Sequence, residues 1–290
     1  MTDFAQRRNG SLLGSFVADA LSLGVHWIYD TTELAAKFGY IDSYHAPGSD
    51  SYHPHKTAGD QGHVGDQALC LAKFLKNEKR WDQAAFMQHW LKVWPDYNDY
   101  FDHATKTVLA NIKSSAAPTE AASDSAELAG PARIAPLIAF LADQDEATGT
   151  KAAVEQTTLT HNSPAAIEAA TFLATATYRI LHGADLVETL KSTAPPKALQ
   201  QANAVIDLDA TKAIAQLGQS CAIDKALPSV IYLALKYSDD LPKAFSENAM
   251  AGGDNCARGL ALGMLLGAAL GEKAIPAKWK DDLNQIPVVN

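Results

Sequence analysis

The sequence predicts an all-α fold, and two observations lead to this prediction. Alanine, the residue with the highest intrinsic helix propensity, supplies about one residue in six. Apolar residues recur at intervals of three and four in several segments, which is the spacing of one face of an α-helix. The alternating pattern of a half-buried strand is nearly absent, and its best example is the short segment 204–208.

The helical spacing predicts helices, in order, near residues 12–21, 68–75, 134–141, 165–180 and 257–270. Ser163 and Pro164 stand just before the fourth of these, where a hydroxyl cap and a proline in the first turn favour a helix start. The last segment is small and apolar on nearly every side, which is typical of a helix that is buried all round.

Two polar segments interrupt these helices. Residues 43–66 are rich in glycine, proline, histidine and aspartate and predict a long loop, and such loops often carry function in compact proteins. Residues 114–125 predict either a surface loop or a short connector. The sequence has no repeat and no linker that divides it, so we expect a single compact helical bundle over residues 1–290.

Charge and cysteine content exclude several classes of protein. The 290 residues carry 33 acidic and 24 basic side chains, and the resulting net charge of −9 repels the phosphates of a nucleic acid. Three cysteines without a CxxC spacing argue against a disulfide framework. The most apolar stretch, 257–271, contains Arg258 and is shorter than the about 20 residues of a membrane span. The first residues lack the order of a signal peptide, so we expect a cytoplasmic protein without membrane contact.

Two polar clusters lie in the first quarter of the chain. Asp19 stands in an apolar run, where an aspartate needs a partner or a backbone donor. His26 follows seven residues later, so the two side chains share a helical face unless Gly24 ends the helix. Asp66 and Gln67 stand where the long loop meets the next helix, and Asp66 is either an N-cap or a carboxylate that faces a ligand.

Two further clusters stand at later helix starts. His161 is either a solvated residue beside a helix cap or part of a site. Gly252 and Gly253 allow the backbone to approach a neighbour closely. A helix then begins with three polar or reactive residues, Asp254, Asn255 and Cys256. Because a helix N-terminus lowers the pKa of a thiol, Cys256 is either a reactive thiol or an inert packed one.

Together, these clusters resemble the motifs of the ADP-ribosylglycohydrolase superfamily over about residues 10–271. The motifs that carry the resemblance are Ala18-Asp19-Ala20-Leu21-Ser22, Gly65-Asp66-Gln67, Gly130-Pro131-Ala132-Arg133, Thr160-His161 and Gly252-Gly253-Asp254-Asn255-Cys256-Ala257. The resemblance implies an all-α bundle with two central magnesium ions. It also implies that the segment around Arg133 lies against the substrate, and that His26 stands at the position of a catalytic acid.

The metal motif of that family is incomplete in this chain. The resemblance places the six ligands on Gly65, Asp66, Gln67, Asp254, Cys256 and Ala257, and only Asp66 and Asp254 keep a carboxylate. Magnesium requires hard oxygen ligands in near-octahedral geometry. We therefore expect no firmly held cofactor, and at most a weakly held magnesium ion at Asp66 and Asp254. This pattern is closest to the branch that includes the J-type lens crystallins.

The residues and the resemblance together predict a hydrolase of a glycosidic bond in an ADP-ribose-like or nucleoside-linked small molecule. The candidate catalytic residues are His26, Asp66, Asp254 and Cys256. The candidate substrate-binding residues are Asp19, Gln67, Arg133, His161, Gly252, Gly253 and Asn255. His26 acts as general acid or base, and in one variant it activates Cys256 as a thiolate from within hydrogen-bond reach. The alternative is a non-catalytic ligand-binding or crystallin-type structural protein of the same fold.

Two other features allow more than one interpretation. Four histidines of the long loop suit zinc better than magnesium, although a solvated loop with scattered histidines is the simpler interpretation. They are His45, His53, His55 and His63. The aromatic residues between 90 and 101 form either core or a wall on which a ring of the ligand stacks.

Overall fold

The structure is a computed structural model that describes residues 3–289, and these residues form helices without any strand, which confirms the all-α prediction. The helices of the first half are α1 (Phe4–Leu23), α2 (Thr31–Phe38), α3 (His63–Glu78), α4 (Gln83–Val93), α5 (His103–Lys113), α6 (Ala129–Ala132) and α7 (Ala135–Phe140). The later ones are α8 (Glu146–Thr158), α9 (Pro164–Leu181), α10 (Leu186–Thr193), α11 (Pro196–Ala204), α12 (Ala210–Leu217), α13 (Ile223–Lys236), α14 (Leu241–Met250), α15 (Asn255–Leu270) and α16 (Ala277–Asp281). Short 3-10 helices are η1 (Trp94–Asp96), η2 (Pro118–Glu120) and η3 (Glu272–Ala274).

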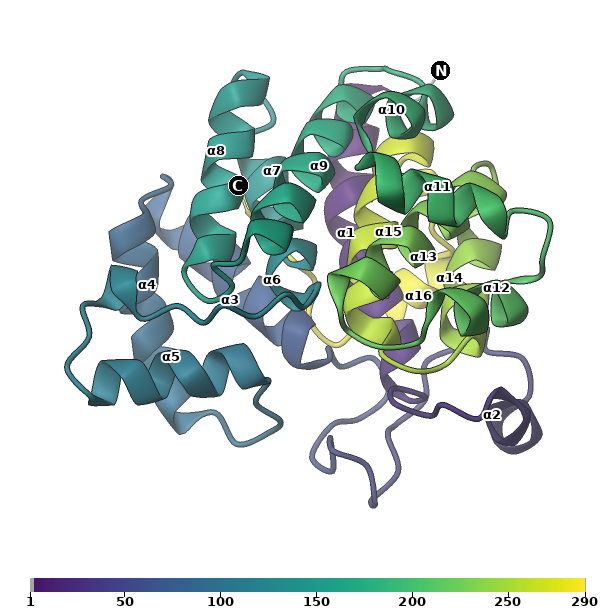
Figure 1. Cartoon of the computed structure of the whole chain (residues 1–290), viewed down its shortest axis with the longest axis horizontal. Coiled ribbons are helices and arrows are strands. Elements are labelled where there is room, and N and C mark those ends of the chain that lie inside the picture. Colours follow the sequence, from purple (N-terminus) through teal and green to yellow (C-terminus); the bar gives the residue numbers. More distant parts are fainter. Residues whose placement is uncertain (1–2, 290) are drawn as a thin grey trace.

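Helices α1 and α15 lie side by side at the centre of the molecule (Figure 1). They approach closely because glycines face each other, and a Cβ added to Gly14 would lie 2.8 Å from the carbonyl oxygen of Gly263. Two hydroxyls of α1 use this closeness. Ser11 Oγ donates to the carbonyl of Met264 at 3.0 Å, and Ser15 Oγ donates to that of Leu260 at 2.9 Å.

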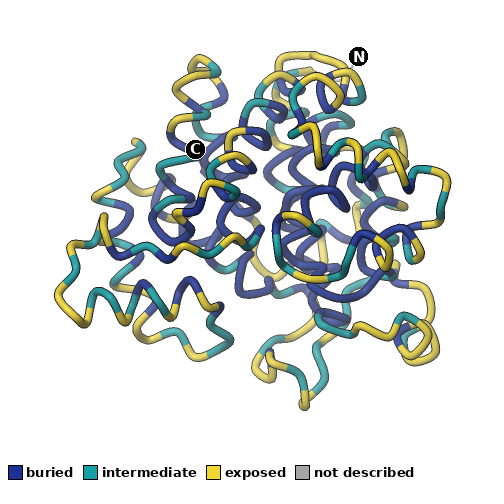
Figure 2. The backbone as a smooth tube through the Cα atoms, in the orientation of Figure 1, coloured by how far each residue is buried: buried dark blue, intermediate teal, exposed yellow. Residues whose placement is uncertain are grey.

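The remaining helices cover this central pair. Helices α9, α13 and α14 pack against α15, α7 packs against α1, and α8 lies outside α9. The burial pattern follows the same arrangement, since the central helices are largely buried while the long loop below them mixes exposed, intermediate and buried residues (Figure 2). No helix within residues 3–289 combines the length and the apolar character that crossing a membrane requires.

Most of the predicted helices are confirmed. The segments 12–21, 68–75, 165–180 and 257–270 lie in α1, α3, α9 and α15, and α15 is buried along almost its whole length. Ser163 caps α9 as predicted, because its side chain accepts a hydrogen bond from the backbone N–H of Ala166 at 3.2 Å. The segment 134–141 forms only the short helix α7.

The segment 204–208, the best example of an alternating pattern in the sequence, does not form a strand. Helix α11 ends at Ala204, and the next residues form tight turns in which Ile206 N–H donates to the carbonyl of Asn203. Val205 is buried at this helix end. Its β-branched side chain packs into the core at a turn. In the sequence, a short apolar run at such a turn cannot be distinguished from a short strand.

The long loop is confirmed between α2 and α3, and its Lys56 reaches the first turn of α3, where it pairs with Asp66. The predicted connector 114–125 contains the short helix η2. The single domain expected over residues 1–290 stays a prediction.

Candidate functional site

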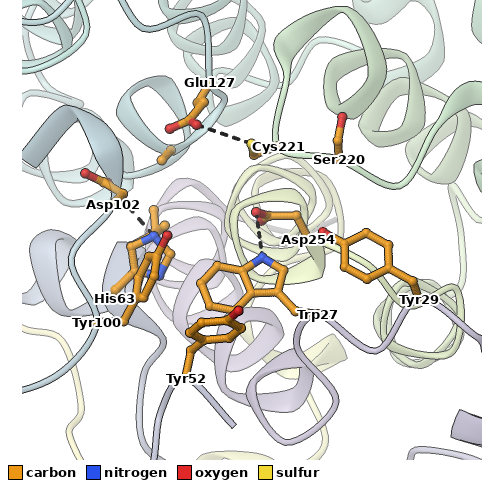
Figure 3. Close-up of a pocket in the computed structure, with 12 residues that line it drawn as sticks. Trp27, Tyr29, Tyr52, His63, Tyr100, Asp102, Glu127, Ser220, Cys221 and Asp254 are labelled. Atoms are coloured by element: carbon orange, nitrogen blue, oxygen red, sulfur yellow. Dashed lines mark hydrogen bonds and ion pairs between the residues drawn. The ribbon is translucent and has the colours of Figure 1, made fainter.

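A pocket of about 490 Å³ lies where the starts of several helices meet (Figure 3). Its lining comes from the turn after α1, the long loop, the start of α3, the segment before α5, α6 and the segments before α13 and α15. The lining residues are Trp27, Tyr29, Tyr52, His63, Val64, Tyr100, Asp102, Glu127, Ala129, Ser220, Cys221 and Asp254. The pocket is thus walled by aromatic rings and carries three carboxylates, with no lysine or arginine among the lining residues.

Gly252 and Gly253 fix one wall of this pocket. Both have positive φ angles, +62° and +66°, which glycine adopts without strain. Gly253 N–H donates to the carbonyl of Ile28 at 2.8 Å, and Gly253 accepts from Trp27 N–H at 2.9 Å. Close backbone approach was predicted here, and the neighbours are the chain's own Ile28 for Gly252 and Gln219 for Gly253. Neither glycine lines the pocket.

Asp254 is the one predicted catalytic residue that lines the pocket. It precedes α15, and one of its carboxylate oxygens, Oδ2, accepts a hydrogen bond from Trp27 Nε1 at 3.0 Å. Trp27 itself has a positive φ of 63°, a conformation that is uncommon for a large side chain. The hydrogen bonds of the Gly253 turn hold that conformation and so orient both the indole and the carboxylate.

Glu127 lies on another wall of the pocket. The segment around it pairs with the segment before α13, because Leu128 N–H donates to the carbonyl of Cys221 and Ile223 N–H donates to that of Ala126, each at 2.9 Å. Cys221 Sγ donates to Glu127 Oε1 at 3.4 Å. Burial, reinforced by the nearby carboxylates, raises the pKa of Glu127 above its usual value. The pKa of this carboxyl group is thus shifted in the direction that a proton donor requires.

Asp66 is not the N-cap of its helix, so that interpretation is wrong. Helix α3 begins at His63 after Gly62, and Asp66 is its fourth residue. The carboxylate accepts from Tyr97 Oη at 2.6 Å and forms an ion pair with Lys56 Nζ. Burial raises the pKa of Asp66, against the opposing effect of Lys56. Asp66 does not line the pocket, because both partners turn it away.

Gln67 and Arg133 belong to a buried network behind the pocket. Gln67 Oε1 accepts from Trp90 Nε1 at 3.1 Å and from Arg133, while Gln67 Nε2 donates to Thr105 at 2.8 Å. Arg133 also donates to the hydroxyl of Thr160. Both side chains are buried and neither lines the pocket, and their contact with substrate stays a prediction.

His161 is completely buried beside this network, which excludes its interpretation as a solvated residue. Its Nδ1 lies 2.8 Å from the hydroxyl of Thr160. Burial lowers the pKa of His161 far below its usual value. His161 does not line the pocket, and its imidazole instead fills the space beside Gly130.

Asp19 and Cys256 are fully buried where α1, α3 and α15 meet. Asp19 Oδ2 accepts from Gly62 N–H at 2.7 Å, and a Cβ added to Gly62 would lie 3.1 Å from Cys256 Sγ. The chain segments around residues 62–66 and 254–256 therefore meet, although only Asp254 of the two aspartates Asp66 and Asp254 lines the pocket. Burial and the charge of Asp19 raise the pKa of Cys256 well above its usual value, which disfavours the thiolate that the nucleophile hypothesis requires.

His26 lies beyond the end of α1, because the helix stops at Leu23 with Gly24 as its C-cap. Its Nδ1 lies 2.9 Å from Oδ1 of Asn255, so Asn255 holds an imidazole and does not line the pocket. Burial lowers the pKa of His26 to about 4. The low pKa gives no support to the predicted role as an acid or base near neutral pH. The thiolate variant expected a hydrogen bond with Cys256, whereas the hydrogen-bond partner of the imidazole is Asn255.

Several residues of the pocket were not predicted from the sequence. Glu127 and Cys221 meet only through the pairing of two distant segments, for which the sequence offers no pattern. Tyr100 lies within the aromatic segment that was considered as a stacking wall, whereas Trp90 and Trp94 of that segment are core residues. The sequence feature that could have pointed to Tyr100 is its position two residues before Asp102, the N-cap of α5.

Comparisons with known proteins agree with the helical architecture. A family model described as ADP-ribosylglycohydrolase matches residues 1–289. Crystallin J1A of Tripedalia cystophora is 22% identical over 295 residues, and the match covers 94% of this chain and 90% of that protein. A solved structure, described as an ADP-ribosylglycohydrolase-related protein complex, superposes with a TM-score of 0.69 at 24% identity, over 98% of this chain and 94% of that one.

Proposed function

This chain belongs to the ADP-ribosylglycohydrolase family, and from this premise we propose that it hydrolyses a glycosidic bond in a nucleoside-linked small molecule. The observation that carries the proposal is that Glu127 and Asp254 line one aromatic pocket. Glycoside hydrolysis requires such a pair of carboxyl groups, one protonated and one ionised, on either side of the bond that breaks.

The aromatic rings select the kind of ligand. Trp27 and Tyr100 meet edge to face with centroids 4.6 Å apart, and Trp27 and Tyr52 do so at 5.1 Å. Such rings offer flat and edge surfaces to a nucleobase or a similar ring. The carboxylates of the pocket repel phosphate groups and no lining side chain offsets that repulsion. An uncharged or cationic riboside therefore fits the pocket better than a diphosphate such as ADP-ribose.

In this proposal Glu127 acts as the general acid and Asp254 as the general base. The bond between the anomeric carbon and the leaving group breaks, and the leaving group takes the electron pair and a proton from Glu127. Asp254 stabilises the positive charge that develops on the sugar ring and accepts a proton from the attacking water, whose oxygen bonds to the anomeric carbon. A proton returns from Asp254 to Glu127 through the solvent of the open pocket.

We propose that this reaction proceeds without the two-magnesium centre that the resemblance implies. The donor set does not fit paired magnesium ions, because the positions aligned with the ligands already have protein partners. Asp66 is paired with Lys56, and Gln67 Oε1 accepts from Trp90 and Arg133. Cys256 offers a soft, buried sulfur that contacts the carbonyl of Asp19. The proposed steps at Glu127 and Asp254 require no metal ion.

The test is the hydrolysis of ribosides that differ in their leaving groups. We expect Glu127→Gln to reduce kcat/KM about 100-fold or more for inosine or nicotinamide riboside, because a general acid contributes about 10²–10⁴. The same variant should lose little activity towards 4-nitrophenyl riboside, whose leaving group departs without a proton. Glu120→Gln, at an exposed position of η2, is the matched control and should match the wild type on all substrates.

The proposal fails if the wild-type protein cleaves no riboside, or if Glu127→Gln slows both kinds of substrate equally. The second candidate function is then a non-catalytic protein, which the similarity to Crystallin J1A favours. Thermal denaturation with the same ribosides separates two forms of it. A ligand-binding protein gains melting temperature with a riboside, whereas a structural protein does not.

A further inference from the structure

Three histidines from different segments meet behind Trp27. His26 follows α1, His53 comes from the long loop, and His63 is the first residue of α3. All three are buried. One ring nitrogen of each lies within 4.8 Å of one ring nitrogen of each of the others. Two of these residues were among the loop histidines considered for zinc, whereas His45 and exposed His55 are not part of the cluster.

Two of the three imidazoles have one nitrogen held by an outer hydrogen-bond partner. His26 Nδ1 lies 2.9 Å from Asn255 Oδ1, and His53 Nδ1 lies 3.1 Å from Asp99 Oδ1. His63 Nε2 faces the carboxylate of Asp102 at 3.9 Å, which is beyond hydrogen-bond distance. Histidines that bind metals are oriented in this way, with the second nitrogen directed to a carboxylate or an amide oxygen.

The other nitrogen of each ring has no hydrogen-bond partner among the described residues. These atoms are His26 Nε2, His53 Nε2 and His63 Nδ1, and all are buried. An unsatisfied buried polar atom costs about 1–3 kcal/mol. Three such atoms on the rings of one cluster add up to a large cost, and an ion bound by these nitrogens would remove it.

We propose that His26, His53 and His63 bind a single divalent d-block cation, with zinc as the first expectation. Three imidazoles and one open position are a common ligand set for Zn²⁺ in proteins. Zn–N distances of about 2.0–2.1 Å place the nitrogens of a tetrahedral site about 3.3 Å apart. The present spacing therefore requires small side-chain rotations, and the three rings have centroids only 5.6–6.2 Å apart.

The carboxylates around the cluster favour a cation. Asp99 and Asp102 are the outer carboxylates, and Asp254 lies close enough to raise the pKa of His26 and His63 against the larger effect of burial. Lys56, Arg133 and Arg258 act on the histidines in the opposite direction. The charge of Lys56 is paired with Asp66, whereas Arg133 and Arg258 donate to uncharged groups.

The cluster also has two routes for an ion to enter. His63 lines the candidate active-site pocket, and His26 and His53 line a neighbouring hollow of about 220 Å³. Trp27 lines both hollows, and its indole lies 4.1 Å from His26 and 5.3 Å from His53 between ring centroids. The proposed site is formed by residues other than Glu127, so its occupancy does not depend on the riboside chemistry.

The experiment is titration of the full chain, stripped with a chelator, with ZnCl₂ in a calorimeter and with Co²⁺ in a spectrophotometer. We expect one Zn²⁺ per chain and the intense visible bands of four-coordinate Co²⁺. His53→Gln should weaken Zn²⁺ binding by more than the about 10- to 100-fold that losing an outer partner costs. His55→Gln is the matched control on the same loop and should bind as the wild type does.

Asp99→Asn provides a second test that leaves the three imidazoles in place, and it should weaken Zn²⁺ binding by about 10- to 100-fold. Circular dichroism reports whether each variant is folded. The proposal is overturned if the wild type binds no stoichiometric Zn²⁺ and shows no four-coordinate Co²⁺ spectrum. It is also overturned if His55→Gln removes binding, or if folded His53→Gln and Asp99→Asn proteins bind like the wild type.

Discussion

Gly263→Ala is expected to destabilise the protein by about 3 kcal/mol or more, because a methyl group there meets the backbone of α1. A Cβ at this position would overlap the carbonyl group of Gly14 and would lie 2.8 Å from Cα of Ser15. Neither helix can shift easily, since Ser11 and Ser15 bind carbonyls of α15 on both sides of this contact. Urea denaturation of the purified variant measures the loss.

Gly149→Ala is the matched control for this prediction. Gly149 lies inside α8, and no atom lies within 4 Å of the place where its Cβ would be. Both substitutions bring the same gain in helix propensity, about 1 kcal/mol. We therefore expect Gly149→Ala to stabilise the protein slightly and Gly263→Ala to destabilise it. Equal free energies of unfolding for the two variants would show that the helix contact has no such cost.

The helical pattern of the sequence was enough to predict the fold because the central helices bury nearly all of their surface. Residues 257–270 are small and apolar on every side, and this alone places them in the middle of a bundle. The partner of this helix was not predicted, although Gly10 and Gly14 repeat at the four-residue interval of Gly259, Gly263 and Gly267. The apolar pattern within one segment indicates both that it forms a helix and how much of that helix is buried.

The site was predicted less well because its members depend on contacts between distant segments. Asp254 was found from its place at a helix start. Glu127 was missed, since its role follows from an isolated pairing with the segment before α13. Asp66 was expected in the site, but a lysine ten residues earlier in the long loop pairs with it. The course of an irregular loop cannot be derived from helical spacing, and this one decides which carboxylates remain available.

Asp19 stands in an apolar segment and therefore needs a hydrogen-bond donor, and the structure shows which group supplies it. Asp19 is fully buried, and its Oδ2 accepts from the backbone N–H of Gly62. The hydrogen bond from Gly62 does not fully replace the lost water. Burial, with a further contribution from the charge of Asp66, raises the pKa of Asp19 from 3.8 to about 7. The folded protein thus keeps a proton on this carboxyl that the unfolded chain releases near pH 4.

The stability that this group contributes therefore falls as the pH rises. Below pH 3.8 both states are protonated at Asp19, and between about pH 4 and pH 7 only the folded state holds the proton. Each unit of difference between the pKa values of the folded and unfolded states changes the free energy of unfolding by about 1.4 kcal/mol. For the shift of Asp19 from 3.8 to about 7, the ionised carboxylate therefore lowers the free energy of unfolding by about 4 kcal/mol above pH 7. An asparagine at this position keeps an oxygen for Gly62 N–H and does not ionise.

Asp19→Asn is therefore expected to gain stability relative to the wild type as the pH rises, by about 2.5 kcal/mol between pH 5 and pH 8. Using the difference between the two proteins at each pH cancels the titration of the buried histidines, which affects both equally. Asp145→Asn is the control, because hydrogen bonds from Thr148 lower the pKa of this exposed cap and its difference from the wild type should stay flat over that range. A constant difference for Asp19→Asn, measured by urea denaturation, would mean that Asp19 is ionised at little cost, and that a cation beside it, such as the ammonium of Lys56, compensates for its burial.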